Sequence, residues 1–283
     1  SLAGSPFTLS TGSVVSLAPT LASSVTSVAI SPSLGNSLSL NASTGVISGT
    51  ATGTLAATTY TLTASNVAGA SATTTFSLRL VSNPTISVTG SPFSYTTGDL
   101  VNIAPSVSAS VTQVTLSPSL SNGLSLNSAT GVISGTASGS LAVTSYTLTA
   151  VNAAGSSQTT TLSLQIQDPP SISLTGSPFR YSTGDAVSIL PTLGSSVSAV
   201  SVSPALANGL SLNTSTGEIS GSATGLLPAT TYTLSASNAA GATATTTLSL
   251  QIVAPPTISL TGSPFSYSTG DSVTITPTLG SSV

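Results

Sequence analysis

Residues 146–167 read Tyr-Thr-Leu-Thr-Ala-Val-Asn-Ala-Ala-Gly-Ser-Ser-Gln-Thr-Thr-Thr-Leu-Ser-Leu-Gln-Ile-Gln. Apolar and polar residues alternate in 146–150 and again in 161–167, with Asn-Ala-Ala-Gly between them. Alternation with a period of two is typical of strands, so the stretch predicts two strands joined by a turn. The residues expected to face the core are Tyr146, Leu148, Ala150, Leu162, Leu164 and Ile166.

This stretch belongs to a sequence unit that recurs every 86 residues. The markers are Tyr60, Tyr146 and Tyr232; Gly49, Gly135 and Gly221, which bound a short strand; and Phe7, Phe93, Phe179 and Phe265. The chain contains three copies without insertion or deletion and the start of a fourth. A fixed period indicates a tandem array. An array of near-identical modules favours a spacer, stalk or fibre. Catalysis needs one special site, and three equal copies offer none.

Each unit contains about seven short strands, with turn residues every 8–12 positions and no helical period. This pattern predicts an all-β fold of tandem immunoglobulin-like β-sandwiches with antiparallel strands. The predicted domains are residues 1–83, whose first strand is cut short, 84–169 and 170–255, followed by a partial repeat at 256–283. Both ends of the sequence fall inside a unit, so we expect cuts through a longer array.

The junctions between units are short and contain proline, at 82–84, 168–170 and 254–256. Proline fixes its own φ and restricts the residue before it, so these junctions are expected to be stiff. Such units should stack end to end. The partial fourth unit is too short to bury a core alone, so either further chain or a neighbouring subunit would complete it.

Charged residues make up only 2 % of the chain. The basic residues are Arg79 and Arg180; the acids are Asp99, Asp168, Asp185, Glu218 and Asp271. Two arginines cannot neutralise a phosphate backbone or hold a membrane surface, which argues against nucleic acid as a partner. No apolar run approaches the length of a membrane-spanning helix. The chain has no Cys, His or Lys, so disulfides and Lys–Asn cross-links are excluded.

Residues 118–135, Pro-Ser-Leu-Ser-Asn-Gly-Leu-Ser-Leu-Asn-Ser-Ala-Thr-Gly-Val-Ile-Ser-Gly, together with 146–155, resemble a known family. They are similar to the immunoglobulin-like (Ig) repeats, cadherin-like in fold, of bacterial and archaeal surface proteins. The resemblance covers all three full units. In the first unit Gly35-Asn36-Ser37 replaces Ser-Asn-Gly, so one turn there is expected to differ. The resemblance implies an extracellular or cell-surface location and no catalysis.

Asp99, Asp185 and Asp271 recur in a Thr-Gly-Asp turn, where the first unit has Ser13. They are candidate calcium ligands, as in cadherins. Calcium takes six to eight oxygens from several groups, however, and no second acid accompanies these residues. Asp168 occurs at one junction only. We therefore predict a turn or capping role for these aspartates, with no metal site and no cofactor.

Tyr60, Tyr146 and Tyr232 are predicted to be core tyrosines whose hydroxyls tie down a turn, as in immunoglobulin folds. The alternative is a ligand-stacking set. The phenylalanines at 7, 93, 179 and 265 alternate with Tyr95, Tyr181 and Tyr267. Core or inter-module packing is expected for them, and an exposed stripe for carbohydrate is the alternative.

Two N-glycosylation sequons stand at the same repeat position, Asn41-Ala-Ser and Asn213-Thr-Ser. The middle copy, Asn127-Ser-Ala, breaks the pattern, and chance is the competing explanation. The many Ser and Thr residues are also candidate acceptors for O-linked glycans.

Catalysis has no visible basis. Without His, Lys or Cys, the chain cannot build a Ser-His-Asp triad, a Ser-Lys pair or a cysteine nucleophile. Each unit has too few acids for paired carboxylates.

The leading hypothesis is therefore a structural protein of an extracellular filament or surface fibre. Its partners would be copies of itself, because a surface with little net charge promotes association. The alternatives are a passive stalk of a large monomeric adhesin and a carbohydrate-binding or enzyme-accessory module.

Overall fold

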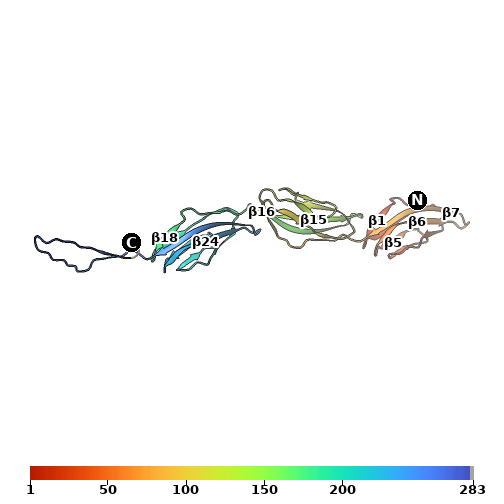
Figure 1. Cartoon of the computed structure of the whole chain (residues 1–283). Helices are drawn as coiled ribbons and strands as arrows, with labels where there is room; N and C mark the ends of the chain where they lie inside the picture. Colours follow the sequence, from red (N-terminus) through yellow and green to blue (C-terminus); the bar gives the residue numbers. More distant parts are fainter. Residues whose placement is uncertain (281–283) are drawn as a thin grey trace. The chain divides into compact units, whose positions relative to one another are not determined.

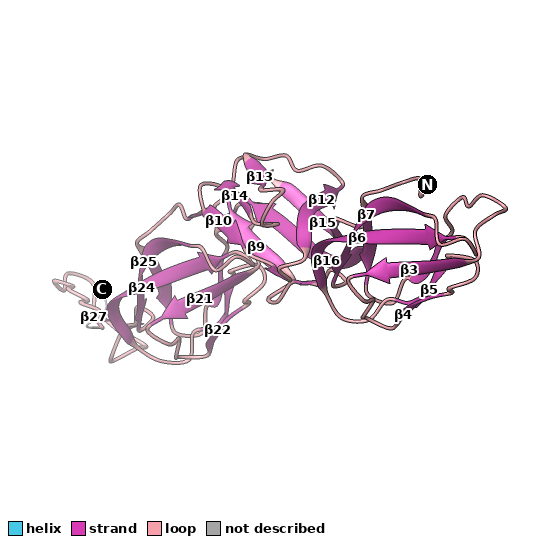
Figure 2. Cartoon of the chain, turned by 90° about the vertical axis from the view of Figure 1, so that its right-hand side faces the viewer, coloured by secondary structure: helices cyan, strands magenta, loops and turns pink. Residues whose placement is uncertain are grey.

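A computed structural model describes residues 1–280 of the chain. Within these residues the backbone forms strands and turns but no helix (Figure 2), and hence none long and apolar enough to cross a membrane. The all-β class and the tandem immunoglobulin-like organisation predicted from the sequence are confirmed.

The first repeat contains seven strands (Figure 1): β1 (Phe7–Ser10), β2 (Val14–Leu17), β3 (Ser27–Ser31), β4 (Leu38–Leu40), β5 (Ile47–Thr50), β6 (Leu55–Ser65) and β7 (Ser71–Val81). One sheet has the order β1-β7-β6-β3, and the other has the order β2-β5-β4. The hairpin β6–β7 is the longest element, and it pairs Tyr60 with Phe76 after a bulge between Leu55 and Thr58.

The second repeat has the same strands and two short additional ones: β8 (Ile86–Ser87), β9 (Phe93–Thr96), β10 (Leu100–Ile103), β11 (Ser106–Val107), β12 (Val111–Ser117), β13 (Leu124–Leu126), β14 (Ile133–Thr136), β15 (Leu141–Asn152) and β16 (Ser157–Gln167). Its sheets have the orders β12-β15-β16-β9 and β10-β14-β13, and β8 pairs with β11 in a small ribbon.

The third repeat follows the second strand for strand: β17 (Ile172–Ser173), β18 (Phe179–Ser182), β19 (Ala186–Ile189), β20 (Thr192–Leu193), β21 (Ala199–Ser203), β22 (Leu210–Leu212), β23 (Ile219–Ser222), β24 (Leu227–Ser237) and β25 (Thr243–Val253). Its sheets are β18-β25-β24-β21 and β19-β23-β22, with β17 paired to β20. In the described residues after it, up to residue 280, the strands are β26 (Ile258–Ser259) and β27 (Thr278–Leu279), which pair with each other.

One pairing differs from the expected antiparallel arrangement. In the first repeat β1 runs parallel to β7, with Phe7 beside Leu78, and in the third β18 runs parallel to β25. β1 and β18 therefore each lie beside the last strand of their repeat and run in the same direction as it. Turn signals in a sequence indicate hairpins between neighbouring strands, and they do not indicate this long-range pair.

The core lies between the two sheets of each repeat. In the first repeat it contains Ile47 and Leu78, both fully buried, and ten buried side chains form one cluster. The expected alternation in the second repeat is confirmed, since Leu148 and Leu164 are fully buried and their strand neighbours are not. Burying one such side chain contributes about 1.5–3 kcal/mol.

Gly49, Gly135 and Gly221 occupy a position where two short strands approach closely. Their φ angles are +142°, +145° and +142°. A Cβ on Gly135 would lie 2.2 Å from the carbonyl oxygen of Gly123. Glycine is required there by both backbone conformation and space.

The turn at residues 35–37 keeps the left-handed backbone of its counterparts. Ser37 has φ +60°, where Gly123 and Gly209 have +76° and +78°. The sequence predicts that this turn differs from its counterparts. The backbone conformation is the same, but Ser37 has a side chain where the counterparts have glycine, and left-handed backbone is strained for residues other than glycine.

By internal contacts the chain divides into two compact units: residues 1–93 with 98–165, and residues 94–97 with the chain from Ile166 onward. The first unit joins repeat 1 to most of repeat 2. These units do not coincide with the sequence repeats, so the repeat boundaries remain a prediction.

Candidate functional site

Within the first compact unit, repeat 2 is joined to repeat 1 by the side chain of Asn152. This residue ends β15 and is 2 % exposed. Its Nδ2 donates to the hydroxyl oxygen of Ser10 at 2.9 Å and to the carbonyl oxygen of Ser82 at 2.9 Å. Both acceptors belong to repeat 1: Ser10 is the last residue of β1, and Ser82 directly follows β7. A turn residue of one repeat therefore binds the rim of the preceding one.

The same side chain also holds its own turn. Asn152 Oδ1 accepts hydrogen bonds from the backbone N–H of Ala154 and Ser156, at 3.0 and 3.1 Å. The Ser156 hydroxyl lies 2.6 Å from the Ser10 hydroxyl. A primary amide has two N–H donors and one carbonyl acceptor, and all of them are used here. Fully paired buried polar groups make an arrangement specific, because any displacement leaves them unpaired.

The second compact unit contains the same arrangement around Asn238, which is 3 % exposed. Its Nδ2 donates to the Thr96 hydroxyl at 3.1 Å and to the Asp168 carbonyl at 3.3 Å. The Oδ1 accepts from the N–H of Ala240 and Ala242. The contact of Asn152 is therefore a repeated feature of the fold.

A serine hydroxyl binds the chain between repeats at the first two junctions. Ser110 Oγ donates to the Asn83 carbonyl at 3.2 Å in the first unit, and Ser196 Oγ donates to the Pro169 carbonyl at 3.1 Å in the second. Together with the prolines, these bonds restrict the connecting backbone.

The Thr-Gly-Asp turns bind their own backbone. Asp185 Oδ2 accepts from the Ser182 N–H at 2.7 Å, and Asp271 Oδ2 accepts from the Ser268 N–H at 2.7 Å. The carbonyl of Asp99 accepts from the N–H of Ala137. Residues 1–280 contain no group of three His, Cys, Asp or Glu that could hold a metal ion. Asp185 and Asp271 thus each bind a backbone N–H of their own turn, and the capping role stays a prediction.

The three repeated tyrosines lie in the core. Tyr60, Tyr146 and Tyr232 are 2–3 % exposed. Burial raises the pKa of the Tyr146 phenol, because its ionised form would lose hydration. The ring of Tyr60 stacks on Phe76, with centroids 5.4 Å apart and planes inclined at 18°. A ligand-stacking role would need an exposed ring face, and the turn-binding role of the hydroxyls stays a prediction.

Phe7, Phe93 and Phe179 are half-buried. Phe7 meets Phe76 edge-on, with centroids 6.1 Å apart. Phe93 and Phe179 stand at the same position, and Phe179 packs against the core of repeat 3. Beyond the third repeat, Phe265 and Tyr267 stack on each other at 6.4 Å, and Tyr267 is 47 % exposed.

The side chains of the two candidate glycosylation residues, Asn41 and Asn213, bind the backbone of their own turns. Asn41 Oδ1 accepts from the N–H of Ser43 and Thr44, and Asn213 Oδ1 accepts from those of Ser215 and Thr216. Asn127, which lacks a sequon, makes the same two bonds. The turn explains the asparagine at all three positions, and glycosylation stays a proposal.

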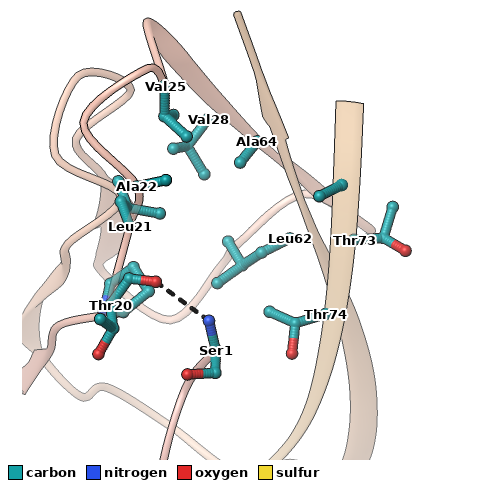
Figure 3. Close-up of a pocket in the computed structure, with 12 residues that line it drawn as sticks. Ser1, Thr20, Leu21, Ala22, Val25, Val28, Leu62, Ala64, Thr73 and Thr74 are labelled. Atoms are coloured by element: carbon teal, nitrogen blue, oxygen red, sulfur yellow. Dashed lines mark hydrogen bonds between the residues drawn. The ribbon is translucent and has the colours of Figure 1, made fainter. Parts of the chain in front are cut away.

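Repeat 1 contains a cavity of about 150 Å³, and Ser1 is one of the residues that line it (Figure 3). Its lining includes Leu21, Val28 and Leu62. The backbone nitrogen of Ser1 donates to the Thr20 carbonyl at 3.1 Å.

Sequence reasoning identified the turns at 152–155 but missed the contacts between repeats. A signal was present, because Asn66, Asn152 and Asn238 recur at the repeat spacing, as do the hydroxyl residues Ser10, Thr96 and Ser182. An asparagine in a turn is already explained by the bonds that its Oδ1 accepts within the turn, however. The bonds that its Nδ2 donates go to the preceding repeat, so nothing in the turn itself indicates them.

The family described as Putative Ig domain matches the chain three times, over residues 1–81, 79–167 and 166–253. No curated protein matches the sequence. Among solved structures, the chain is similar to titin domains I67–I69 in an E-to-A mutated variant, with 17 % identity and a TM-score of 0.52 over 88 % of this chain and 95 % of that chain. This likeness shows the fold alone.

Two further structures are similar at lower scores. Sidekick-1 immunoglobulin domains 1–5 show 15 % identity and a TM-score of 0.43, over 90 % of this chain and 60 % of that chain. Extracellular domains 3–5 of Drosophila OTK show 12 % identity and a TM-score of 0.41, over 89 % and 96 % of the two chains.

Proposed function

This chain belongs to the Putative Ig domain family, and from that premise we propose that it is a structural protein of an extracellular filament or surface fibre. Its repeats stack end to end, and its charge-poor faces associate laterally with copies of the same chain. The chain carries out no reaction of its own. Glycans on the exposed turns at Asn41 and Asn213 are part of the same proposal.

The observation that supports this proposal best is the repeated junction. Asn152 and Asn238 are buried, fully hydrogen-bonded and placed at the same point of two successive repeats. A fibre of stacked repeats needs defined contacts between neighbouring repeats. Flexible linkers would instead be rich in glycine and would lack such contacts.

Composition supports lateral association. A formal net charge of −3 over 283 residues leaves each repeat nearly neutral, and near-neutral surfaces attract one another more readily than highly charged ones. Contacts made by hydroxyls and small apolar groups are insensitive to ionic screening. Fibres of this chain should therefore persist in high salt and across a wide pH range.

Electron microscopy of the purified chain tests the proposal. Ordered bundles that survive molar salt and a shift between about pH 5 and pH 9 would support it. Isolated particles at every protein concentration would instead favour a passive adhesin stalk. Bundles that dissolve in moderate salt would contradict lateral association by uncharged surfaces.

The stacked pair Phe265 and Tyr267 favours an accessory role in carbohydrate binding, because an aromatic face can stack on a sugar ring. A pull-down on cellulose and a glycan array compare the chain with its Tyr267→Ala variant. Retention that depends on Tyr267 would favour this second function.

A further inference from the structure

The outward face of the four-stranded sheet carries a regular array of hydroxyl groups. In hairpin β6–β7 the buried residues Tyr60 and Leu62 alternate with threonines, which therefore point away from the core. The outward residues pair across the two strands as Thr59 with Ser77, Thr61 with Thr75 and Thr63 with Thr73. We call the outward residues of this hairpin, and of its counterparts in repeats 2 and 3, the hydroxyl face.

The array recurs in every repeat. The hairpin strands β24 and β25 lie side by side as β6 and β7 do (Figure 2), and their pairs are Thr231 with Ser249, Thr233 with Thr247 and Ser235 with Thr245. Repeat 2 has hydroxyl residues at the same six positions, Ser145, Thr147, Thr149, Thr159, Thr161 and Ser163. Neighbouring strands lie about 4.8 Å apart, and outward residues recur about every 6.8 Å along a strand. The hydroxyls therefore form a lattice of the same spacing in each repeat.

The hydroxyls of this lattice are not used by the fold. Within residues 1–280, none of them has a hydrogen-bond partner in the chain. The outward face of the three-stranded sheet differs, because Ser39 Oγ donates to the Ser48 carbonyl at 3.4 Å, and Ser125 and Ser211 make the same bond in the other repeats. A hydroxyl is both a donor and an acceptor, so the hydroxyl face has unused capacity of both kinds.

The hydroxyl face is also almost free of charge. Among residues 1–280, the strands of the four-stranded sheets contain no acid, and their basic residues are Arg79 and Arg180. Arg79 lies beside Thr8, and Arg180 lies beside Gln251, so both are in the parallel pair at the edge of the sheet. Surfaces of soluble domains usually carry many charges of both signs. A face without them can be covered by another surface without removing a charge from water.

We propose that copies of the chain associate laterally through the hydroxyl face, with the hydroxyls of one copy hydrogen-bonded to those of the next. This inference rests on the proposed function and names the surface that its lateral contact uses. A second copy is the occupant that the chemistry favours, because a group that both donates and accepts is complementary to itself. The spacing of the lattice also matches that of an identical lattice. Contacts that use the same patch on both partners are the commonest in homo-oligomers.

The area of the face supports this choice of surface. The four-stranded sheet of repeat 1 has strands of 4, 11, 11 and 5 residues, so it covers about 500 Å² in projection. The three-stranded sheet has strands of 4, 4 and 3 residues and covers about 180 Å². Specific interfaces bury about 800 Å² on each partner. A stable pair therefore needs the hydroxyl faces of two or more repeats, and the chain contains three.

Sedimentation velocity over a rising concentration series, with electron microscopy of the same samples, is the test. The face variant combines Thr61→Lys, Thr147→Lys and Thr233→Lys, which place a positive charge within each lattice. Like charges would then meet when two faces approach, so the association constant should fall at least about tenfold. Molar salt should restore part of this loss, because it screens the repulsion.

The matched control combines Ser48→Lys, Ser134→Lys and Ser220→Lys on the outward face of the three-stranded sheet. Three lysines change the formal net charge from −3 to zero in either variant, so net charge cannot cause a difference between them. The control should associate like the parent chain. Thermal unfolding shows whether each variant is folded. If the face variant is not, the neighbouring strand provides a second one with Thr75→Lys, Thr161→Lys and Thr247→Lys.

The outcomes separate this contact from the proposed function. A face variant that associates like the parent chain, or an equal loss in the control, overturns the assignment of the face and leaves lateral association standing. A parent chain that stays monomeric at about 1 mM overturns both. A monomeric parent chain that is retained on cellulose, and loses this retention in the face variant, would make a polysaccharide the occupant and would equally overturn the contact between copies.

Discussion

The side-chain nitrogen of Asn152 lies 2.9 Å from the hydroxyl oxygen of Ser10, although 142 residues separate them in the chain. This contact binds a hairpin turn of one repeat to the end of the repeat before it. The amide is buried, so its hydrogen bonds are shielded from competing water. Together with the Ser156–Ser10 and Ser110–Asn83 bonds, this side chain therefore holds the arrangement of the two repeats in the first compact unit.

Replacing Asn152 with alanine should destabilise this unit by about 2–3 kcal/mol, since the buried partners of the amide would be left unpaired. Hydrogen exchange measures the effect locally, as faster exchange of the Ala154 and Ser156 amides, and denaturant unfolding measures it overall. Asn66→Ala removes only the bonds within a turn, so it should cost about 1 kcal/mol. Equal costs for the two variants would show that the contact with Ser10 contributes nothing.

Gly135→Ala should cost about 3 kcal/mol or more, because its Cβ would lie 2.2 Å from the Gly123 carbonyl oxygen and φ is +145°. Gly98→Ala is the control, since Gly98 also has positive φ but has open space around it. It should cost only about 1–2 kcal/mol. The thermal midpoints of the two variants provide the comparison. A Gly135→Ala protein as stable as Gly98→Ala would mean that the backbone contact is easily relieved.

Ser37→Gly should stabilise repeat 1 by about 0.5–1 kcal/mol, because glycine adopts φ +60° without the strain that a side chain causes. The hydrogen bond between the hydroxyls of Ser37 and Thr52 is exposed to solvent, so its loss should change the free energy of unfolding little. The reverse change, Gly209→Ser, should destabilise repeat 3. Urea unfolding of both variants checks the opposite signs, and a shift in the same direction would contradict the strain argument.

Stability should fall at alkaline pH because of Tyr146. Burial raises the pKa of this phenol above its ordinary value of 10.0, so the unfolded chain loses the proton first as the pH rises. The contribution to the free energy of unfolding is complete below about pH 10 and is lost above it. Tyr146→Phe should have a smaller difference between the stabilities at about pH 8 and pH 11, measured by chemical unfolding. An unchanged difference would exclude Tyr146 as the cause.

Much of the fold follows from local sequence. Alternation in residues 146–150 and 161–167 predicts the buried rows around Leu148 and Leu164, because neighbouring side chains on a strand point to opposite faces. The parallel pairing of β1 with β7 could not be predicted in the same way. Four-residue β1 has no turn linking it to its partner, so only the assembled core determines its place.

The junction illustrates a second limit. The sequence shows Asn152 in a turn, and the hydrogen bonds that its Oδ1 accepts from the N–H of Ala154 and of Ser156 are those expected of a turn asparagine. The bonds that Nδ2 donates go to the preceding repeat, and no local sequence pattern predicts how closely that repeat lies. The 86-residue recurrence of both partners was the available clue.

The parallel alignment of the first and last strands determines how a repeat resists mechanical force. Within the four-stranded sheet of repeat 1, β1 comes first along the chain and β7 comes last, and these strands are bonded side by side from Phe7 and Leu78 to Ser10 and Val81. Tension applied through the two ends pulls the strands along each other, in shear. All the hydrogen bonds between them then carry the load at once, whereas an antiparallel pair would open one bond at a time.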